Sequence, residues 1–322
     1  GNLNKKCVHF AHFFVFDRSV TMNLYTKFVN FMSTIKVKII GVGNRGCNVL
    51  NRLNDLPKSV KRIAIAKREK VFEGLEVNKK IELTQVDIDN PGQAIDSKKS
   101  QIEKILDNTD IGFFISNLTN KVTVTQTATI AQLARQKGIL TVFVGASPFF
   151  FEGKLALEQS EQNKAYLHDE IDSVLVLDSD KTIQKGVPIA EGLTKVDNML
   201  SGVILSIIDL INKCGVINVD FADLRSTIEN GGELFFNSIS GTKEDLTSIV
   251  NQLFTNTQLK STKTDFSRSL YVIYSNSDLL MQEVGDICNK IQKQLTNKAR
   301  IIFGVVNDAK IKQNLKIVLL AN

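Results

Sequence analysis

The chain of 322 residues has little of what marks disordered, fibrous or disulfide-stapled proteins. It contains only 4 prolines, and its 43% hydrophobic and 23% charged residues are ordinary for a globular protein. Its 4 cysteines lie far apart without a Cys-x-x-Cys pair, so neither a disulfide framework nor a zinc ribbon is indicated. With 3 histidines in the chain, no metal site is expected. The length predicts about two domains, and the cysteine usage predicts a reduced, cytoplasmic protein.

Long apolar runs and stripes of one charge are also missing. No segment approaches the ~20 apolar residues that span a membrane, so no membrane span is expected. The formal net charge is +6, but the basic residues are scattered, and the densest run, residues 58–70, surrounds an apolar strand pattern. Its lysines and arginines are therefore interpreted as solvated strand ends, and no nucleic-acid partner is expected.

Residues 1–34 form an N-terminal extension that has three competing interpretations. A basic pair followed by the apolar run VHFAHFFVF (8–16) loosely matches a signal peptide, but the run holds two histidines and no A-x-A site follows. Residues 24–32 carry apolar side chains at helical spacing. The extension is interpreted as additional residues before a true start at Met22 or Met32, as a packed docking helix, or as a membrane-surface anchor, in that order.

From residue 35 the pattern becomes that of a phosphate-binding turn. The run IKVKII (35–40) predicts a strand, Gly41, Gly43 and Gly46 predict a turn, and the next residues predict a helix. A strand, glycine turn and helix point backbone N–H groups at a phosphate. The spacing also matches the dinucleotide fingerprint. A dinucleotide enzyme needs an acidic residue after the second strand, where this chain has Lys67 and Arg68, so that hypothesis rests on the glycines alone.

The rest of the chain predicts a two-domain α/β architecture. Alternating strand and helix patterns at 35–190 predict a parallel sheet covered by helices, as in a Rossmann-like nucleotide-binding domain. A long apolar helix at 191–216 follows, and residues 217–322 carry strands of their own. We therefore expect an α/β fold in which a central helix joins the first domain to a second, smaller α+β domain.

Five segments resemble the FtsZ branch of the tubulin/FtsZ family, in the family's own order. The residues that carry the resemblance are IKVKIIGVGNRGCNVLNRL (35–53), GILTVFVGASPFFFEGK (138–154), IDSVLVLDSDKTI (171–183), INVDFADLRSTI (217–228) and ARIIFGVVNDAKIKQNLKIVLLAN (299–322). The resemblance implies a GTP-dependent filament protein of cell division with the tubulin/FtsZ fold. It also implies that residues 217–228, the synergy loop, complete the nucleotide site of the next subunit.

The chain departs from the family where GTP is bound. The family's glycine-rich loop falls on TNKVTVT (119–125), where no glycine is left to let backbone approach phosphate. Its acid after the second strand falls within IAKR (65–68), and its second phosphate loop falls within LTQVDIDNP (83–91). Its base-contacting asparagine falls on Ser179. Its guanine-reading aspartate falls on Asn198, whose amide cannot offer guanine two identical acceptors.

The resemblance thus implies one weakened face and one complete face. The weakened nucleotide site consists of Gly41, Gly43, Gly46, Asn48, Glu152 and Asn198. It predicts lost or weakened binding of GTP or GDP, and Mg²⁺ only where GTP binds. Asn218, Asp220 and Asp223 match the synergy loop, whose carboxylates position and polarise water on a neighbour's nucleotide. Taken without the resemblance, Asp220 more simply caps a helix that begins near Ala222.

Two functions follow from these expectations. The first is an FtsZ-like, pseudo-GTPase subunit that assembles with itself or with another FtsZ-type subunit, or regulates filaments, through its synergy loop. The second is a divergent GTPase that polymerises and drives division itself, with Lys67, Arg68 or Lys121 replacing the lost backbone contacts. The sequence stops directly after the family's last strand, so no C-terminal tethering peptide is expected.

Overall fold

The computed structural model describes residues 35–54, 56–83, 90–183, 186–213, 215–255, 257–259, 265–295, 298–311 and 314–322. The N-terminal extension and residues 84–89 of the expected second phosphate loop lie outside these residues. The interpretations given for these two segments therefore stay predictions. Within the described residues, no helix combines the length and apolar character needed to cross a bilayer.

The first part of the chain is built on a seven-stranded sheet in the order β3-β2-β1-β4-β5-β6-β7, with all strands parallel. Most strand residues are buried, because a parallel sheet of this kind is covered on both faces. The strands are β1 (Val37–Val42), β2 (Val60–Ala66), β3 (Lys79–Glu82), β4 (Ile111–Ile115), β5 (Leu140–Ala146), β6 (Ser173–Leu177) and β7 (Gly232–Glu233).

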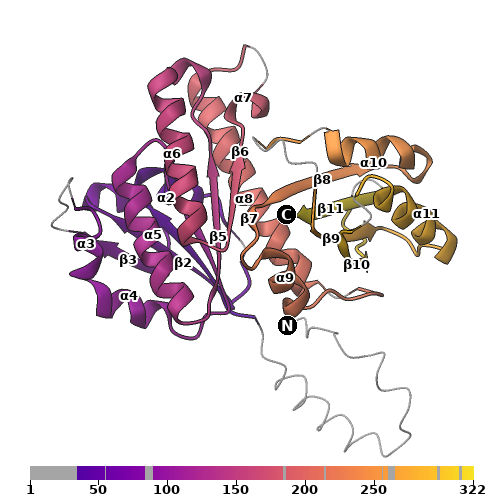
Figure 1. Cartoon of the computed structure of the whole chain (residues 1–322), viewed down its shortest axis with the longest axis horizontal. Helices are drawn as coiled ribbons and strands as arrows, with labels where there is room; N and C mark the ends of the chain where they lie inside the picture. Colours follow the sequence, from indigo (N-terminus) through magenta and orange to yellow (C-terminus); the bar gives the residue numbers. More distant parts are fainter. Residues whose placement is uncertain are drawn as a thin grey trace, which may run out of the picture.

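Helices pack on both faces of this sheet (Figure 1). One face carries α3 (Gln93–Asp96), α4 (Lys99–Leu106), α5 (Lys121–Gln136) and α6 (Lys154–Glu170), which share one buried core with the sheet. The other face carries α2 (Gly43–Leu50) and α8 (Ile189–Asn212), which share a second core with the rest of the molecule. The short α7 (Ser179–Thr182) precedes α8, and single 3₁₀ turns lie at Glu69–Phe72, Phe150–Glu152 and Lys243–Asp245.

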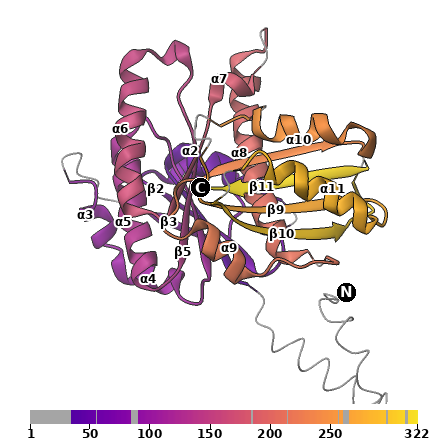
Figure 2. The ribbon, with the colours of Figure 1, turned by 45° about the vertical axis from the view of Figure 1, so that its right-hand side comes forward.

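The second part of the chain is a smaller four-stranded sheet in the order β10-β9-β11-β8. Its strands are β8 (Phe235–Gly241), β9 (Arg268–Ser275), β10 (Arg300–Asn307) and β11 (Leu315–Ala321); β10 is parallel to β9, and β11 is antiparallel to both neighbours. Its helices are α9 (Phe221–Ile228), α10 (Leu246–Thr255) and α11 (Met281–Gln292). Helix α9 contacts β9 and β11, and α10 contacts β8 and α11 (Figure 2). The expected α/β class with a second, smaller domain is confirmed.

The long helix α8 connects the two parts of the molecule (Figure 1). Its 24 residues rise about 36 Å, since an α-helix advances ~1.5 Å per residue. The apolar residues Val196, Leu200 and Ile207 are buried along one side, as the helical spacing predicts. Strand β7 lies beyond the expected boundary at residue 216 and completes the first sheet. The exact division into domains stays a prediction.

Candidate functional site

The glycine turn brings β1 and α2 into direct backbone contact. A Cβ on Gly41 would lie 2.5 Å from the carbonyl oxygen of Gly46, and a Cβ on Gly46 would lie 2.6 Å from the carbonyl carbon of Gly41. Gly43, the first residue of α2, has φ +71°, which side chains disfavour. Strand β1 lies between β2 and β4, where the direction of sheet winding reverses. Ligands of open α/β sheets bind at the carboxyl ends of strands at such a point.

A cavity of about 750 Å³, the basic cavity, lies over this turn. Four cations line it, Arg45, Lys67, Arg68 and Lys70, against the single acid Glu73. Because phosphates are bound by cations and polar groups of this kind, the lining suits a polyanion. The expected residues Gly43 and Asn48 belong to it, whereas Gly41 and Gly46 are buried behind the turn that they shape. The full lining is Val42, Gly43, Asn44, Arg45, Asn48, Ala66, Lys67, Arg68, Lys70, Val71, Glu73, Asn117, Asn120, Val122, Thr123 and Gln126.

The start of α5 borders the basic cavity, and its own side chains occupy its backbone N–H groups. The side-chain oxygen of Asn120 accepts from the backbone N–H of Thr123 at 3.1 Å, as an N-cap. The side-chain oxygen of Asn117 accepts from the N–H of Thr119 at 3.1 Å. The methyl group of Thr123 also lies over the turn, 2.8 Å from the position of a Cβ on Gly43. In residues 119–125 the methyl group of Thr123 therefore fills space over the turn, and two backbone N–H groups are engaged by asparagine side chains.

A second cavity of about 330 Å³, the aromatic cavity, adjoins the first. Glu152 lines it, and its side chain accepts from the backbone N–H of Phe149 at 2.9 Å. Ser179 lines it too, but its hydroxyl donates to the carbonyl of Ser147 at 2.5 Å. The lining comprises Arg45, Ser116, Asn117, Ala146, Ser147, Pro148, Phe149, Phe151, Glu152, Ser179, Ile189 and Leu193.

Arg45 and Asn117 line both cavities, so these two residues lie where the cavities adjoin. The Nε of Arg45 lies 2.9 Å from the Oδ1 of Asp197 on α8. Burial raises the pKa of Asp197, and the charges of Arg45 and Arg52 oppose that rise. Sequence reasoning selected Asn198 on α8, which is exposed and lies outside the lining described for either cavity.

Arg45 and Asp197 were missed because their pairing joins two distant parts of the chain. The sequence held one signal for Arg45, which is the only charged side chain inside the turn GVGNRG. For Asp197 the signal was its spacing, four residues after Leu193, which places both on one side of α8.

The synergy loop follows the last residues of α8 and pairs with β10. Ile217 pairs with Val305 through two backbone hydrogen bonds of 2.9 and 3.2 Å. A Cβ on Gly215 would lie 2.1 Å from the carbonyl oxygen of Val305, so only glycine allows this approach. The side-chain oxygen of Asn218 accepts from the N–H of Gly215 at 2.8 Å and so shapes the turn.

Asp220 and Asp223 form a reciprocal cap at the start of α9. The Oδ1 of Asp220 accepts from the N–H of Asp223 at 2.8 Å, and the Oδ2 of Asp223 accepts from the N–H of Asp220 at 3.1 Å. The capping interpretation of Asp220 is therefore confirmed, with the helix beginning at Phe221. Each cap uses one carboxylate oxygen, and no hydrogen bond to the other oxygen is found among the described residues. Nor do these residues contain a cluster of three or more His, Cys, Asp or Glu suited to a metal ion.

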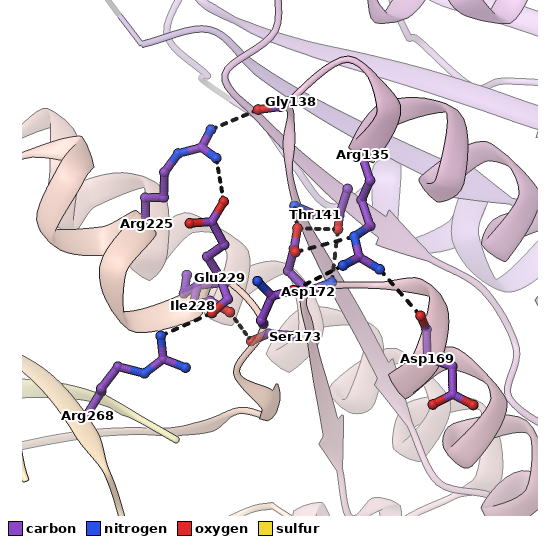
Figure 3. Close-up of polar contacts among 11 residues, drawn as sticks. Arg135, Gly138, Thr141, Asp169, Asp172, Ser173, Arg225, Ile228, Glu229 and Arg268 are labelled. Carbon is purple, nitrogen blue, oxygen red and sulfur yellow. Dashed lines mark hydrogen bonds and ion pairs between the residues drawn. The ribbon is translucent and has the colours of Figure 1, made fainter.

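The far end of α9 is anchored to both sheets (Figure 3). The guanidinium of Arg225 donates to the carbonyl of Gly138 at 2.9 Å, which ties α9 to the loop before β5. The hydroxyl of Ser173 on β6 donates to the carbonyl of Ile228 at 2.7 Å. From the second sheet, Arg268 donates to the carbonyl of Glu229 at 3.1 Å. Helix α9 therefore bridges the two parts of the molecule.

A buried carboxylate supports this anchor from the first sheet (Figure 3). One oxygen of Asp172 accepts from the backbone N–H and the hydroxyl of Thr141, at 2.9 and 2.7 Å. The other oxygen lies 3.4 Å from the Nε of Arg135. These contacts join the starts of β5 and β6, next in the chain to Gly138 and Ser173, which bond to α9.

Large apolar side chains are exposed at both ends of α8. Near its first residues, Phe150 is 73% exposed and Leu155 is also exposed. Just beyond its last residues, Val216 is 72% exposed, and at the start of α11 Met281 is 86% exposed. Contiguous exposed apolar groups mark surfaces that contact other molecules.

A nucleotide-type parallel sheet joined by a long helix to a smaller sheet defines the tubulin/FtsZ architecture. A solved FtsZ dimer from M. jannaschii matches with a TM-score of 0.81 and 20% identity, over 95% of this chain and 92% of that one. The cell division protein FtsZ of Aquifex aeolicus (strain VF5) is 28% identical over 306 residues, which are 90% of this chain and 83% of that protein.

The mitochondrial division protein fszA of Dictyostelium discoideum is 26% identical over 306 residues, which are 90% of this chain but 59% of that longer protein. No protein-family model matches the chain. The chain therefore has the tubulin/FtsZ fold, and its sequence is similar to FtsZ-type division proteins. The expected resemblance to the FtsZ branch is thereby confirmed.

Proposed function

We propose that this protein is an FtsZ-like filament subunit with weakened or lost GTP binding, which acts through its synergy loop on the nucleotide of a neighbouring subunit. The observation that carries the proposal is the start of α5. There Asn117 and Asn120 accept from the N–H groups of Thr119 and Thr123, and the methyl of Thr123 lies over Gly43. A phosphate would have to break these bonds and move this methyl before the backbone could hold it.

The opposite end supports the second half of the proposal. Asp220 and Asp223 each commit one oxygen to the cap and keep the other for a water molecule on a neighbour's nucleotide. Positioned carboxylates can orient water and accept its proton. The anchors at Gly138, Ile228 and Glu229 hold α9 in place, so the carboxylates would not have to be ordered on assembly.

Assembly with a second subunit is supported by the exposed apolar groups at both ends of α8. The exposed apolar side chains at the two ends differ, Phe150 and Leu155 near the start of α8 against Val216 after its end. A contact between unlike patches is heterologous and extends into a row when the rotation does not close. The similar structure from M. jannaschii is an FtsZ dimer. We therefore propose head-to-tail assembly with another copy or with another FtsZ-type subunit.

A residual site for GTP or GDP would use the basic and aromatic cavities. Gly43 and Asn48 would face the phosphates, Glu152 would lie on the nucleoside side, and Mg²⁺ would accompany GTP only. The fit is partial, because the cations of the basic cavity suit phosphates whereas the start of α5 does not. Those cations favour the second candidate function, a divergent GTPase that polymerises by itself. Of the cations named for it, Lys67 and Arg68 line the basic cavity.

Calorimetry and sedimentation separate the two functions. We expect the purified chain to bind Mg²⁺–GTP and GDP weakly or not at all, with a Kd in the range of about 1 mM or above. We also expect it to sediment only together with filaments of an FtsZ-type GTPase. Tight GTP binding together with GTP-dependent filaments of the chain alone would contradict the proposal and establish the divergent GTPase.

A further inference from the structure

Arg45 occupies the junction of the two cavities beside the glycine turn. It lines the basic cavity together with three other cations, and it lines the aromatic cavity together with Phe149 and Phe151. A nucleoside triphosphate that used both cavities would have to pass through this junction, with its phosphates over the glycine turn and its nucleoside between α8 and the phenylalanines. An inorganic phosphate chain would need the basic cavity alone.

The contact that holds Arg45 at this junction is an ion pair in a nearly closed setting. The side chain of Arg45 is 22% exposed and that of Asp197 is 7% exposed, and their Nε and Oδ1 atoms are 2.9 Å apart. Nevertheless, Oδ1 of Asp197 is a buried atom with no hydrogen bond of ordinary geometry among the described residues. Charge attraction therefore holds the pair without the directional bond that a well-aligned arginine would add. Such a contact can be formed in the free chain and broken on opening of the junction.

We infer that Arg45, paired with Asp197, is a built-in block that separates the two cavities and prevents a nucleoside triphosphate from spanning them. The inference rests on the proposed function and names a second feature, besides the start of α5, that limits nucleotide binding at that site. In the free chain the basic cavity accepts a chain of inorganic phosphates, and the nucleoside part of GTP adds no affinity. Removing the arginine side chain opens the junction and lets the nucleoside contribute.

The test compares Mg²⁺–GTP with inorganic tripolyphosphate by calorimetry. The variants are Arg45→Ala and the double variant Arg45→Ala/Asp197→Asn, which leaves no unpaired buried carboxylate if the single variant is unstable. We expect GTP affinity to rise about tenfold or more in both variants. A gain of that size results when a blocked junction, populated in about nine molecules out of ten, is removed. Tripolyphosphate affinity should stay level or fall, because the basic cavity loses one cation.

Arg52→Ala is the matched control. Arg52 is exposed and lies outside the lining described for both cavities, yet its charge also acts on Asp197. It should leave both affinities unchanged.

Two results would overturn the inference that Arg45 blocks the junction. One is unchanged or weaker GTP binding in both Arg45 variants, and the other is an equal rise for GTP and tripolyphosphate. The proposed function is tested separately by the unsubstituted chain, because tight GTP binding there contradicts it whatever the variants do. Weak binding in the unsubstituted chain with no gain in the variants would leave the proposed function standing and remove the block.

Discussion

The helices α5 and α9, which begin near opposite ends of α8, both start with a side-chain N-cap, but the two caps have opposite consequences for ligand binding. At one end, α5 begins with the N-cap Asn120, whose side chain accepts from the N–H of Thr123. At the other end, α9 begins with the N-cap Asp220, whose side chain accepts from the N–H of Asp223. Both caps stabilise a helix start by about 1 kcal/mol. The first consumes donors that an anion would need, whereas the second orients carboxylates toward the outside.

An amide cap competes with an anion for the same backbone N–H groups at a helix start, whereas a carboxylate cap leaves one of its own oxygens unused. A helix that binds phosphate through its N–H groups cannot also satisfy them internally. A carboxylate has two oxygens, so Asp220 and Asp223 can each support the fold with one and face a ligand with the other. Acidic residues that cap the start of α9 are therefore compatible with a start of α5 that contains no glycine.

The largest effect is expected from a substitution in the synergy loop that removes one carboxylate of the α9 cap. Asp223→Asn keeps an oxygen that can accept from the N–H of Asp220 but removes the negative charge. In filaments mixed with an FtsZ-type GTPase, phosphate release at mixed interfaces should fall about 10²–10⁴-fold, the range typical of a lost general base. Glu229→Gln, at the opposite end of α9, is the control and should have little effect. Unchanged release by properly co-assembled Asp223→Asn filaments would show that the carboxylate has no part in the reaction.

An intermediate effect is expected beneath the synergy loop. Asp172→Ala removes a buried acceptor of two hydrogen bonds from Thr141 and the partner of Arg135. We expect the free energy of unfolding to fall by about 3 kcal/mol, measured by urea denaturation. Asp169→Ala is the control, because Arg135 contacts only its backbone carbonyl, and it should change stability by less than about 0.5 kcal/mol. An equal fall in the free energy of unfolding of both variants would show that the buried carboxylate of Asp172 does not stabilise this region.

The smallest effect concerns the end of α8 that carries the synergy loop. Burial acts to raise the pKa of Asp308, but hydrogen bonds from the Lys213 side chain and the Lys310 N–H outweigh it and hold that pKa below the ordinary value. A lowered carboxyl pKa contributes stability above the unfolded-state pKa of about 3.9, and this is lost as pH falls through the lower folded-state pKa.

The free energy of unfolding should therefore fall in acid, and Asp308→Asn should flatten part of that dependence. We expect a contribution below about 1 kcal/mol, because the pair is partly exposed and screened. Urea denaturation of the chain and the variant from about pH 6 to about pH 3 measures it. Asp286→Asn, on the exposed side of α11, is the control. Parallel pH profiles for the chain and Asp308→Asn would contradict the expected role of the pair.

Local patterns were sufficient for the elements and for part of the site. The apolar patterns placed the first strand and the long central helix within a few residues, and the three glycines predicted the turn that joins β1 to α2. The loss of glycine at residues 119–125 was visible in the letters, but the atoms that replaced it were not. The packing of Thr123 over Gly43 depends on α5 and α2 meeting across the sheet.

The sequence by itself determined the fold class, the glycine turn and the capping pattern at Asp220, because each depends on residues close together in the chain. The tertiary structure decided that Asp197, and not Asn198, meets Arg45, and that Arg45 lies where the basic and aromatic cavities adjoin. The same holds for the anchoring of α9 between the sheets. The physical reason is that ion pairs and cavities form between elements that only the packed core brings together, so no local period in the sequence encodes them.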